Sequence, residues 1–128
     1  MPRPRILVVD DDELVRDFVA TVLRLKEYTV DTAVNGREGL TLLEQRRYDL
    51  VVSDMRMPEL DGPGLYHEVM QRSAGAAPPF LFVTGDHGKS DYIWFFQGAR
   101  VPSLAKPFSE TALSQAVERI LGEWPRSS

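Results

Sequence analysis

The sequence contains no cysteine, and none of its apolar runs approaches the roughly 20 residues that a membrane-spanning helix requires. The missing cysteine excludes disulfides and thiolate metal sites, so any bound metal must be held by oxygen or histidine ligands. The short apolar runs predict a chain that does not cross a membrane. The basic start, MPRPR, is not followed by the small-residue cleavage site of a signal peptide, so we expect a cytoplasmic protein.

An excess of positive charge is also missing. The chain carries 15 lysines and arginines against 19 aspartates and glutamates, a net charge of -4. A nucleic-acid surface normally shows a basic face or stripe, so this segment is predicted to bind no nucleic acid. The length of 128 residues predicts one domain over residues 1–128, with its folded core at about 4–122 and a short disordered tail at 125–128.

Short apolar runs alternate with helical patterns along the chain. Strands are predicted at 5–9, 28–34, 48–53, 79–84 and 101–105, with helices between them at about 36–46, 62–72 and 88–98. Two apolar stripes predict the first and last helices: Val15, Phe18, Val19, Val22 and Leu23, and then Leu113, Ala116, Val117, Ile120, Leu121 and Trp124. This alternation predicts an α/β fold with a doubly wound, five-stranded parallel sheet, helices on both faces and the flavodoxin-like strand order 2-1-3-4-5.

Polar side chains stand where the predicted strands end. In an open parallel sheet the carboxyl ends of the strands share one edge, where ligands bind. The residues that this topology brings together are Asp10, Asp11 and Asp12 after the first strand, Asp54 after the third, Thr84 after the fourth and Lys106 after the fifth. The sequence therefore predicts an acidic site with one lysine at that edge.

Such a site needs a cation. Two carboxylates about 4 Å apart repel each other by roughly 4 kcal/mol at an effective dielectric constant near 20. Mg²⁺, with Mn²⁺ as an alternative ion, suits a site of carboxylates, waters and a phosphate oxygen. The acidic turn also lacks the bare N–H groups of a glycine-rich phosphate loop, which disfavours a flavodoxin-like cofactor binder.

A cation would allow Asp54 to act as a nucleophile toward a phosphoryl group, because carboxylates form aspartyl phosphates. Lys106 supplies a positive charge for the phosphoryl oxygens, and Thr84 supplies a hydroxyl. Each side chain has the chemical character that phosphoryl transfer to a carboxylate requires.

The segments VVDDDE, VVSDMRMPELDG, FVTGD and LAKPF stand in an order and spacing that resemble the receiver domain of two-component response regulators. The resemblance covers roughly residues 4–122. It implies that Asp54 is the phosphoacceptor, that Thr84 and Lys106 hold the phosphoryl group and that Lys106–Pro107 is a cis peptide. The metal ligands that it implies are Asp10, Asp11, Asp54 and the backbone carbonyl of Arg56.

The resemblance also implies partners. The phosphodonor would be a histidine kinase or a histidine phosphotransfer protein, and the domain would catalyse only its own phosphorylation and dephosphorylation. A phosphorylation-dependent homodimer through the face of the fourth helix, fifth strand and fifth helix is a further expectation. Few residues follow the last helical stripe, so we expect no effector domain in this chain.

The sequence departs from the family pattern at Ser103. In the family an aromatic residue commonly stands three positions before the lysine that follows the fifth strand, and it serves as a switch. Without it, either Tyr92 or Trp94 takes over that role, or the domain only relays phosphate to a histidine protein. The sequence of this segment is similar to that of receivers fused to hybrid histidine kinases.

The segment DYIWFFQG contains more aromatic side chains than one buried stripe easily absorbs: Tyr92, Trp94, Phe95 and Phe96. Core packing and an exposed partner surface are both open interpretations. Shortly before this segment, Asp86 is placed to pair with Arg56 at the mouth of the pocket and to modulate the lifetime of the phosphoryl group, while His87 is interpreted as a polar loop residue.

Other acidic residues have simpler interpretations. Asp12 and Glu13 are predicted to cap the first helix and to complement its dipole. Asp61–Gly62 is predicted to be a turn that opens the third helix, with no catalytic role.

Two alternative functions stay open. A phosphatase similar to the haloacid dehalogenase family also has Asp-x-Asp after its first strand and would carry covalent phosphate on Asp10 rather than Asp54. That alternative lacks a further acidic motif after Lys106. The second alternative is a receiver that serves only as an interaction module, without phosphorylation.

Overall fold

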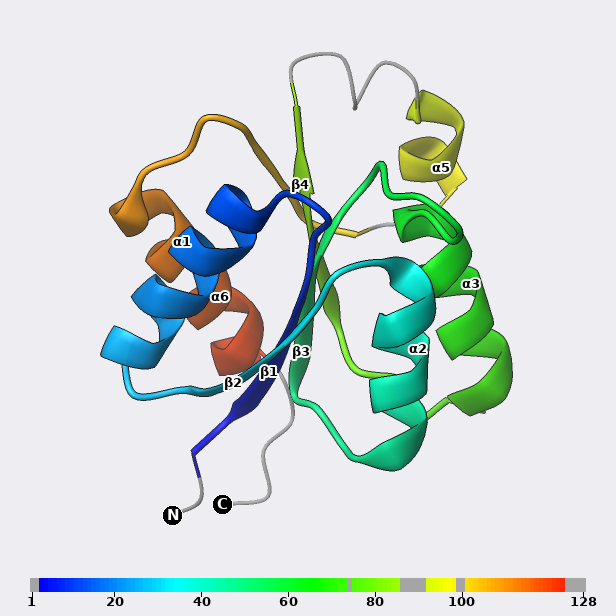
Figure 1. Ribbon diagram of the computed structural model, residues 1–128, viewed down its shortest axis with the longest axis horizontal. Helices are drawn as coiled ribbons and strands as arrows, with labels where there is room; N and C mark the ends of the chain where they lie inside the picture. The colour runs from blue at the N-terminus through cyan, green and yellow to red at the C-terminus, as the bar shows by residue number, and fades with distance from the viewer. Residues whose placement is uncertain (1–2, 74, 86–91, 99–100, 124–128) are drawn as a thin grey trace.

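The computed structural model describes residues 3–73, 75–85, 92–98 and 101–123. Five parallel strands form one sheet in the order β2-β1-β3-β4-β5 (Figure 1). The strands are β1 (Arg5–Val9), β2 (Thr29–Ala33), β3 (Leu50–Asp54), β4 (Phe80–Thr84) and β5 (Ser103–Ala105). The predicted fold class and strand order are confirmed, and each strand falls within two residues of its predicted bounds.

Burial follows the position of each strand in the sheet. β3 and β4 are buried at every residue, and β1 is buried from its second residue onward. These strands lie between neighbours and under helices on both sides, which explains why their sequences are nearly all apolar. The edge strands β2 and β5 are only partly buried and have more mixed sequences.

Helices cover both faces of the sheet. They are α1 (Glu13–Leu25), α2 (Gly36–Gln45), α3 (Gly62–Ser73), α5 (Ile93–Gly98) and α6 (Glu110–Glu123). α1 and α6 lie on one face, and α2, α3 and α5 lie on the other (Figure 1). α5 corresponds to the fourth predicted helix, of which residues 88–91 lie outside the described residues. Within the described ranges, no helix is both long enough and apolar enough to span a bilayer.

Two hydrophobic cores lie against the two faces. Alternate residues of β1 point to opposite sides, so Ile6 and Val8 join one core and Leu7 and Val9 join the other. The core under α1 and α6 has an aliphatic buried centre. The core under α2, α3 and α5 contains the rings of Phe80, Phe82 and Phe95.

One predicted core residue is only partly covered. Phe18 was expected on the buried stripe of the first helix, but it is 40 % exposed, whereas Val19 is 1 % exposed. Its ring lies at the edge of the helix contact, where it meets the ring of Phe108 with centroids 6.0 Å apart. The last helix buries Leu113, Val117 and Leu121 as predicted, while Trp124 lies outside the described residues.

The described part of the segment DYIWFFQG is partly buried and partly exposed, so core packing and an exposed surface each explain part of it. Phe95 is 4 % exposed and packs edge-to-face against Phe82 and Tyr66, with centroids 5.3 and 5.4 Å away. Ile93 and Trp94 are each 56 % exposed. α5 is therefore anchored by one ring and presents an apolar surface beside it.

The predicted caps are confirmed. The side chain of Asp12 accepts hydrogen bonds from the backbone N–H groups of Leu14 and Val15 at 2.9 and 3.4 Å, and Glu13 stands in the first turn of α1. The Asp61 carboxylate accepts a hydrogen bond from the backbone N–H of Gly64 at 2.8 Å in the first turn of α3. Both acids satisfy helix N–H groups that have no partner within the helix.

Gly62 allows α3 to start directly against the end of β3. Its N–H donates to the carbonyl of Met55 at 2.9 Å. A Cβ atom there would stand 2.6 Å from the Asp54 carbonyl oxygen and 2.9 Å from the Phe82 ring. The backbone of Asp54 and this glycine are thus packed without spare space.

We expect Gly62→Ala to lower the free energy of unfolding by about 1–3 kcal/mol, because overpacking a close backbone contact forces it apart. Urea denaturation followed by circular dichroism measures this. Gly122→Ala in α6 is the matched control, since a Cβ there meets no described atom within 4 Å. The control should be neutral or stabilise by up to about 1 kcal/mol, and equal destabilisation of both variants would contradict the packing argument.

Candidate functional site

Three carboxylates from the ends of β1 and β3 meet at the carboxyl edge of the sheet. Asp10 and Asp11 follow β1, and Asp54 is the last residue of β3, the neighbouring strand. Each offers one carboxylate oxygen within 4.8 Å of those of the other two. Asp10 and Asp54 are 1 % and 8 % exposed, while Asp11 is exposed. The predicted convergence of these three side chains is present in the structure.

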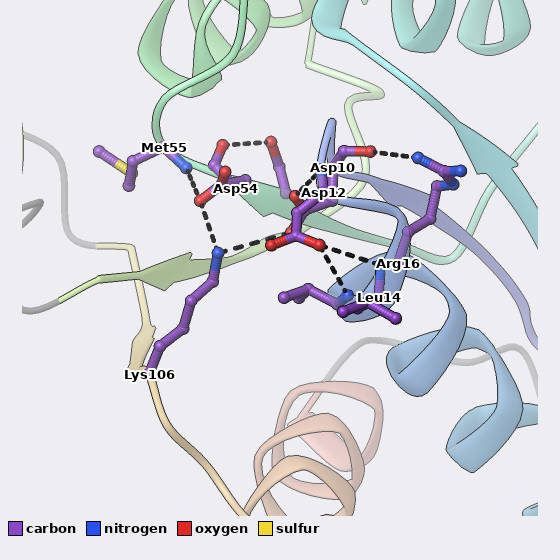
Figure 2. A network of polar contacts seen from close by, with 9 residues as sticks. Asp10, Asp12, Leu14, Arg16, Asp54, Met55 and Lys106 are labelled. Carbon is purple, nitrogen blue, oxygen red and sulfur yellow. Dashed lines mark hydrogen bonds and ion pairs between the residues drawn. The ribbon is translucent and has the colours of Figure 1, made fainter.

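Lys106, which follows β5, extends toward this cluster from the other side (Figure 2). Its Nζ lies 3.3 Å from Asp54 Oδ1 and 3.7 Å from Asp10 Oδ2. The backbone N–H of Met55 also donates to Asp54 Oδ1, at 2.9 Å. Asp54 Oδ2 accepts no hydrogen bond from the residues that the structure describes. One oxygen of this carboxylate is therefore held in place and the other is left for a ligand.

Asp10 is fixed by its own turn. Its Oδ1 accepts from the N–H of Asp12 at 2.9 Å, and its backbone carbonyl accepts from Arg16 Nη1 at 3.0 Å. Its Oδ2 is buried and makes no hydrogen bond within the described part of the chain; its contact with Lys106 is too long to be one. A buried carboxylate oxygen without a hydrogen bond is costly, and a cation bound to this atom would offset the cost.

The electrostatics agree with this inference. Burial raises the pKa of Asp10 to about 6, against the opposing effect of the Asp12 N–H bond. Burial also raises the pKa of Asp54, although the positive charge of Lys106 acts in the other direction. Desolvation disfavours the charged form of a carboxyl group. The ionised site is therefore unfavourable until a further positive charge enters it.

The donor set fits a divalent cation. Three ionised carboxylates and one ammonium leave two negative charges unbalanced, and all the side-chain donors are hard oxygen atoms. Mg²⁺ prefers such ligands. For Arg56 the structure describes an exposed side chain whose guanidinium carbon lies 5.6 Å from the centroid of the Tyr92 ring. The predicted role of its backbone carbonyl as a ligand stays a prediction.

Thr84 ends β4 and is 2 % exposed. Its backbone carbonyl accepts the N–H of Lys106 at 2.6 Å, so β4 positions the start of the loop that carries the lysine. The Lys106–Pro107 bond is cis, as predicted. The predicted contact between the Thr84 hydroxyl and a phosphoryl group stays a prediction.

Other predicted residues lie apart from the cluster or outside the description. Asp12 and Asp61 cap helices. Asp86 and His87, with the proposed pairing of Asp86 to Arg56, fall outside the described residues. Ser103 is a partly buried residue of β5. The sequence analysis missed Arg16, because its bond to the Asp10 carbonyl depends on how the turn folds back on α1.

Comparison with known proteins identifies the family. The model of the response regulator receiver domain matches residues 6–118. Over 116 residues the chain is 34 % identical to the transcriptional regulatory protein GlrR of Escherichia coli K12, which covers 91 % of this chain and 26 % of GlrR. The chain spans about a quarter to a half of the length of the curated relatives it matches.

Solved structures agree with this assignment. The chemotaxis protein CheY4 of Vibrio cholerae is 28 % identical with a TM-score of 0.82, and the match covers 92 % of this chain and 98 % of CheY4. The receiver domain of the sensor histidine kinase PA1611 from Pseudomonas aeruginosa is 27 % identical with a TM-score of 0.85, covering 94 % and 99 % of the two chains. That structure has a magnesium ion coordinated in its active site cleft.

The chain belongs to the response regulator receiver domain family of two-component signal transduction. The family consists of signalling domains rather than metabolic enzymes. The assignment decides against the dehalogenase-like phosphatase and the flavodoxin-like cofactor binder. Its relatives include both transcriptional regulators and receivers of histidine kinases.

The raised pKa of Asp10 predicts how stability depends on pH. Between 3.8 and about 6 the folded chain holds more protons than the unfolded chain, because the folded pKa is the higher one. The free energy of unfolding of the metal-free protein therefore falls as pH rises through this window. Urea denaturation in EDTA at a series of pH values measures the effect.

Asp10→Asn should reduce this dependence, leaving the part due to Asp54, and should stabilise the metal-free protein at pH 7 by about 1–3 kcal/mol, at 1.36 kcal/mol for each unit of pKa difference. Asp17→Asn, an exposed position on α1, is the matched control and should leave the pH profile unchanged. A variant at Asp10 that keeps the full pH slope would show that another group causes it.

Proposed function

We propose that Asp54 accepts a phosphoryl group from the phosphohistidine of a histidine kinase or histidine phosphotransfer protein. The observation that carries this proposal is the state of the Asp54 carboxylate. One of its oxygens is held by Met55 and Lys106, while the other accepts no hydrogen bond from the described residues and lies in a cluster with two further carboxylates. This arrangement orients a nucleophile without blocking it.

The transfer forms one bond and breaks one bond. Asp54 Oδ2 attacks phosphorus, the phosphorus–nitrogen bond of the phosphohistidine breaks, and the electron pair returns to the imidazole nitrogen. The product is an acyl phosphate on Asp54. Lys106 lies 3.3 Å from the neighbouring oxygen, where its charge would stabilise the phosphoryl oxygens, and Thr84 would donate its hydroxyl to them.

Asp10, Asp11, Asp54 and the Arg56 carbonyl would hold Mg²⁺. A bound Mg²⁺ neutralises negative charge on the transferring phosphoryl oxygens and on the cluster. The buried Oδ2 of Asp10, which accepts no hydrogen bond within the described part of the chain, supports this assignment, as does the magnesium ion in the PA1611 receiver. Mn²⁺ is a hard divalent ion that the same oxygen ligands would accept.

The interaction-module alternative leaves the site unexplained. A surface that only binds a partner has no need for a buried carboxylate whose pKa is raised to about 6, because such a group costs folding free energy. Replacing it by an apolar residue would be cheaper. Because the fold bears this loss of folding free energy at Asp10, a chemical role for the cluster is the better explanation.

An apolar groove beside Lys106 supports a protein as the phosphodonor. The groove measures about 510 Å³, and its lining includes Leu14, Phe18, Lys106 and Phe108. Leu14 is 81 % exposed and Phe18 is 40 % exposed. Because Lys106 belongs to both the groove and the acceptor cluster, a protein seated there would present its phosphohistidine next to Asp54.

A second copy of the chain is the other predicted partner. The homodimer through α5, β5 and α6 stays a prediction, supported by the exposed Ile93 and Trp94 on α5. We propose no binding of nucleic acid by these residues.

Incubation with phosphoramidate and Mg²⁺ should add one phosphoryl group to Asp54, as peptide mapping by mass spectrometry will show. Asp54→Asn should abolish labelling, because it removes the attacking carboxylate. Asp12→Asn is the matched control: it keeps a capping oxygen two residues from Asp10 and should label normally. Phosphate on Asp10, or undiminished labelling of Asp54→Asn, would contradict the proposal.

Leu14→Ser should slow phosphoryl transfer at least severalfold from a histidine kinase that phosphorylates the unchanged chain, since an exposed apolar contact is lost. Labelling by phosphoramidate should be unaffected. Leu25→Ser, which is 71 % exposed at the far end of the same helix, is the control and should transfer normally. Equal rates of phosphoryl transfer to the unchanged chain and to both variants would show that the donor does not bind in the groove.

A further inference from the structure

We infer that Tyr92 couples the Asp54 site to the exposed surface of α5, in place of the aromatic residue missing at position 103. This inference rests on the proposed phosphorylation of Asp54. Tyr92 is partly buried, packs against the core of Phe82 and Phe95, and immediately precedes α5. It is thus connected to the helix and lies near the site.

Besides its packing on the core, Tyr92 makes one hydrogen bond and one cation–π contact. Its hydroxyl donates to Asp61 Oδ2 at 3.4 Å, a long hydrogen bond. The guanidinium of Arg56 lies over its ring, 5.6 Å from the centroid. Asp61 also caps α3, so its carboxylate has a fixed position. The ring is therefore restrained by one residue of the α3 turn and by one residue just beyond Asp54.

Arg56 connects this restraint to the acceptor. Asp11, Arg56, Asp61 and Tyr92 are among the residues that line a pocket of about 380 Å³, so the guanidinium and a carboxylate of the acceptor cluster share one cavity. A cation over a solvent-accessible aromatic ring makes only a weak contact. Hydrogen bonds from a guanidinium to a phosphoryl group are stronger. We therefore expect a phosphoryl group on Asp54 to compete with the Tyr92 ring for the Arg56 guanidinium.

A movement of the Tyr92 ring is transmitted to α5 through the backbone of Tyr92. The Tyr92 carbonyl accepts the N–H groups of Phe95 and Phe96 at 2.9 and 3.2 Å, which closes the first turn of the helix. The ring of Trp94 lies 6.3 Å from that of Tyr92. A shift of Tyr92 thus changes the surroundings of Trp94 on the exposed face.

Trp94 fluorescence tests the inference in a Trp124→Phe background, where it is the only tryptophan. Phosphoramidate and Mg²⁺ should change the emission and the acrylamide quenching of Trp94. Tyr92→Leu should be phosphorylated to the same extent but should lose at least two thirds of this response. Tyr92→Phe, which loses only the bond to Asp61, should shift the unphosphorylated signal toward the phosphorylated value.

Tyr66→Phe is the matched control, because it removes a hydroxyl from the same aromatic cluster at a ring that packs on Phe95. Its unphosphorylated signal should equal that of the background chain. If Asp54 is labelled and the Leu variant responds fully, or if the background chain gives no response, the coupling is wrong while the proposed function stands. If no chain is labelled at Asp54, the proposed function fails and the coupling fails with it.

Discussion

The burial of the Asp10 carboxylate beside Asp54 is the constraint on which the rest of the site depends. Two acidic groups are held at the end of an apolar sheet, and the single ammonium of Lys106 lies within hydrogen-bonding distance of only one of them. The fold tolerates this because its cores are well packed on both faces of the sheet. This local cost favours the binding of a small, doubly charged cation, which the proposed transfer of a phosphoryl group to Asp54 requires.

Strand order turns separate pieces of sequence into one site. β1 and β3 are neighbours, so the acidic residues at their ends meet although they are more than forty residues apart in the chain. Lys106 reaches them across β4, whose last carbonyl holds the lysine's own N–H. Asp10, Asp54 and Lys106 are thereby each the last residue of a strand or the residue that follows one. Rigid strand ends place charges more reproducibly than long loops do.

The strands and the acidic edge were predictable because their signals are local. Apolar runs of fixed length identify buried strands, and a carboxylate at the end of such a run is conspicuous whatever the rest of the chain does. Phe18 was misplaced because its exposure depends on how closely α6 and the β5–α6 loop approach α1. Arg16 and the contacts of Tyr92 were not predictable for a related reason. They join positions whose spacing in the sequence has no helical or strand period, so only the folded chain brings them together.

The two helical layers that cover the sheet pack through different kinds of side chain. The buried centre beneath α1 and α6 consists of branched aliphatic side chains and alanine, whereas α5 is attached through perpendicular rings. Aliphatic chains interlock at many points, but a ring held edge-on keeps favourable contact as it tilts. The tilt of α5, and with it the surface that Ile93 and Trp94 expose, can therefore change with little loss of core contact. The opposite layer, which carries the groove beside Lys106, resists such a tilt because its side chains interlock.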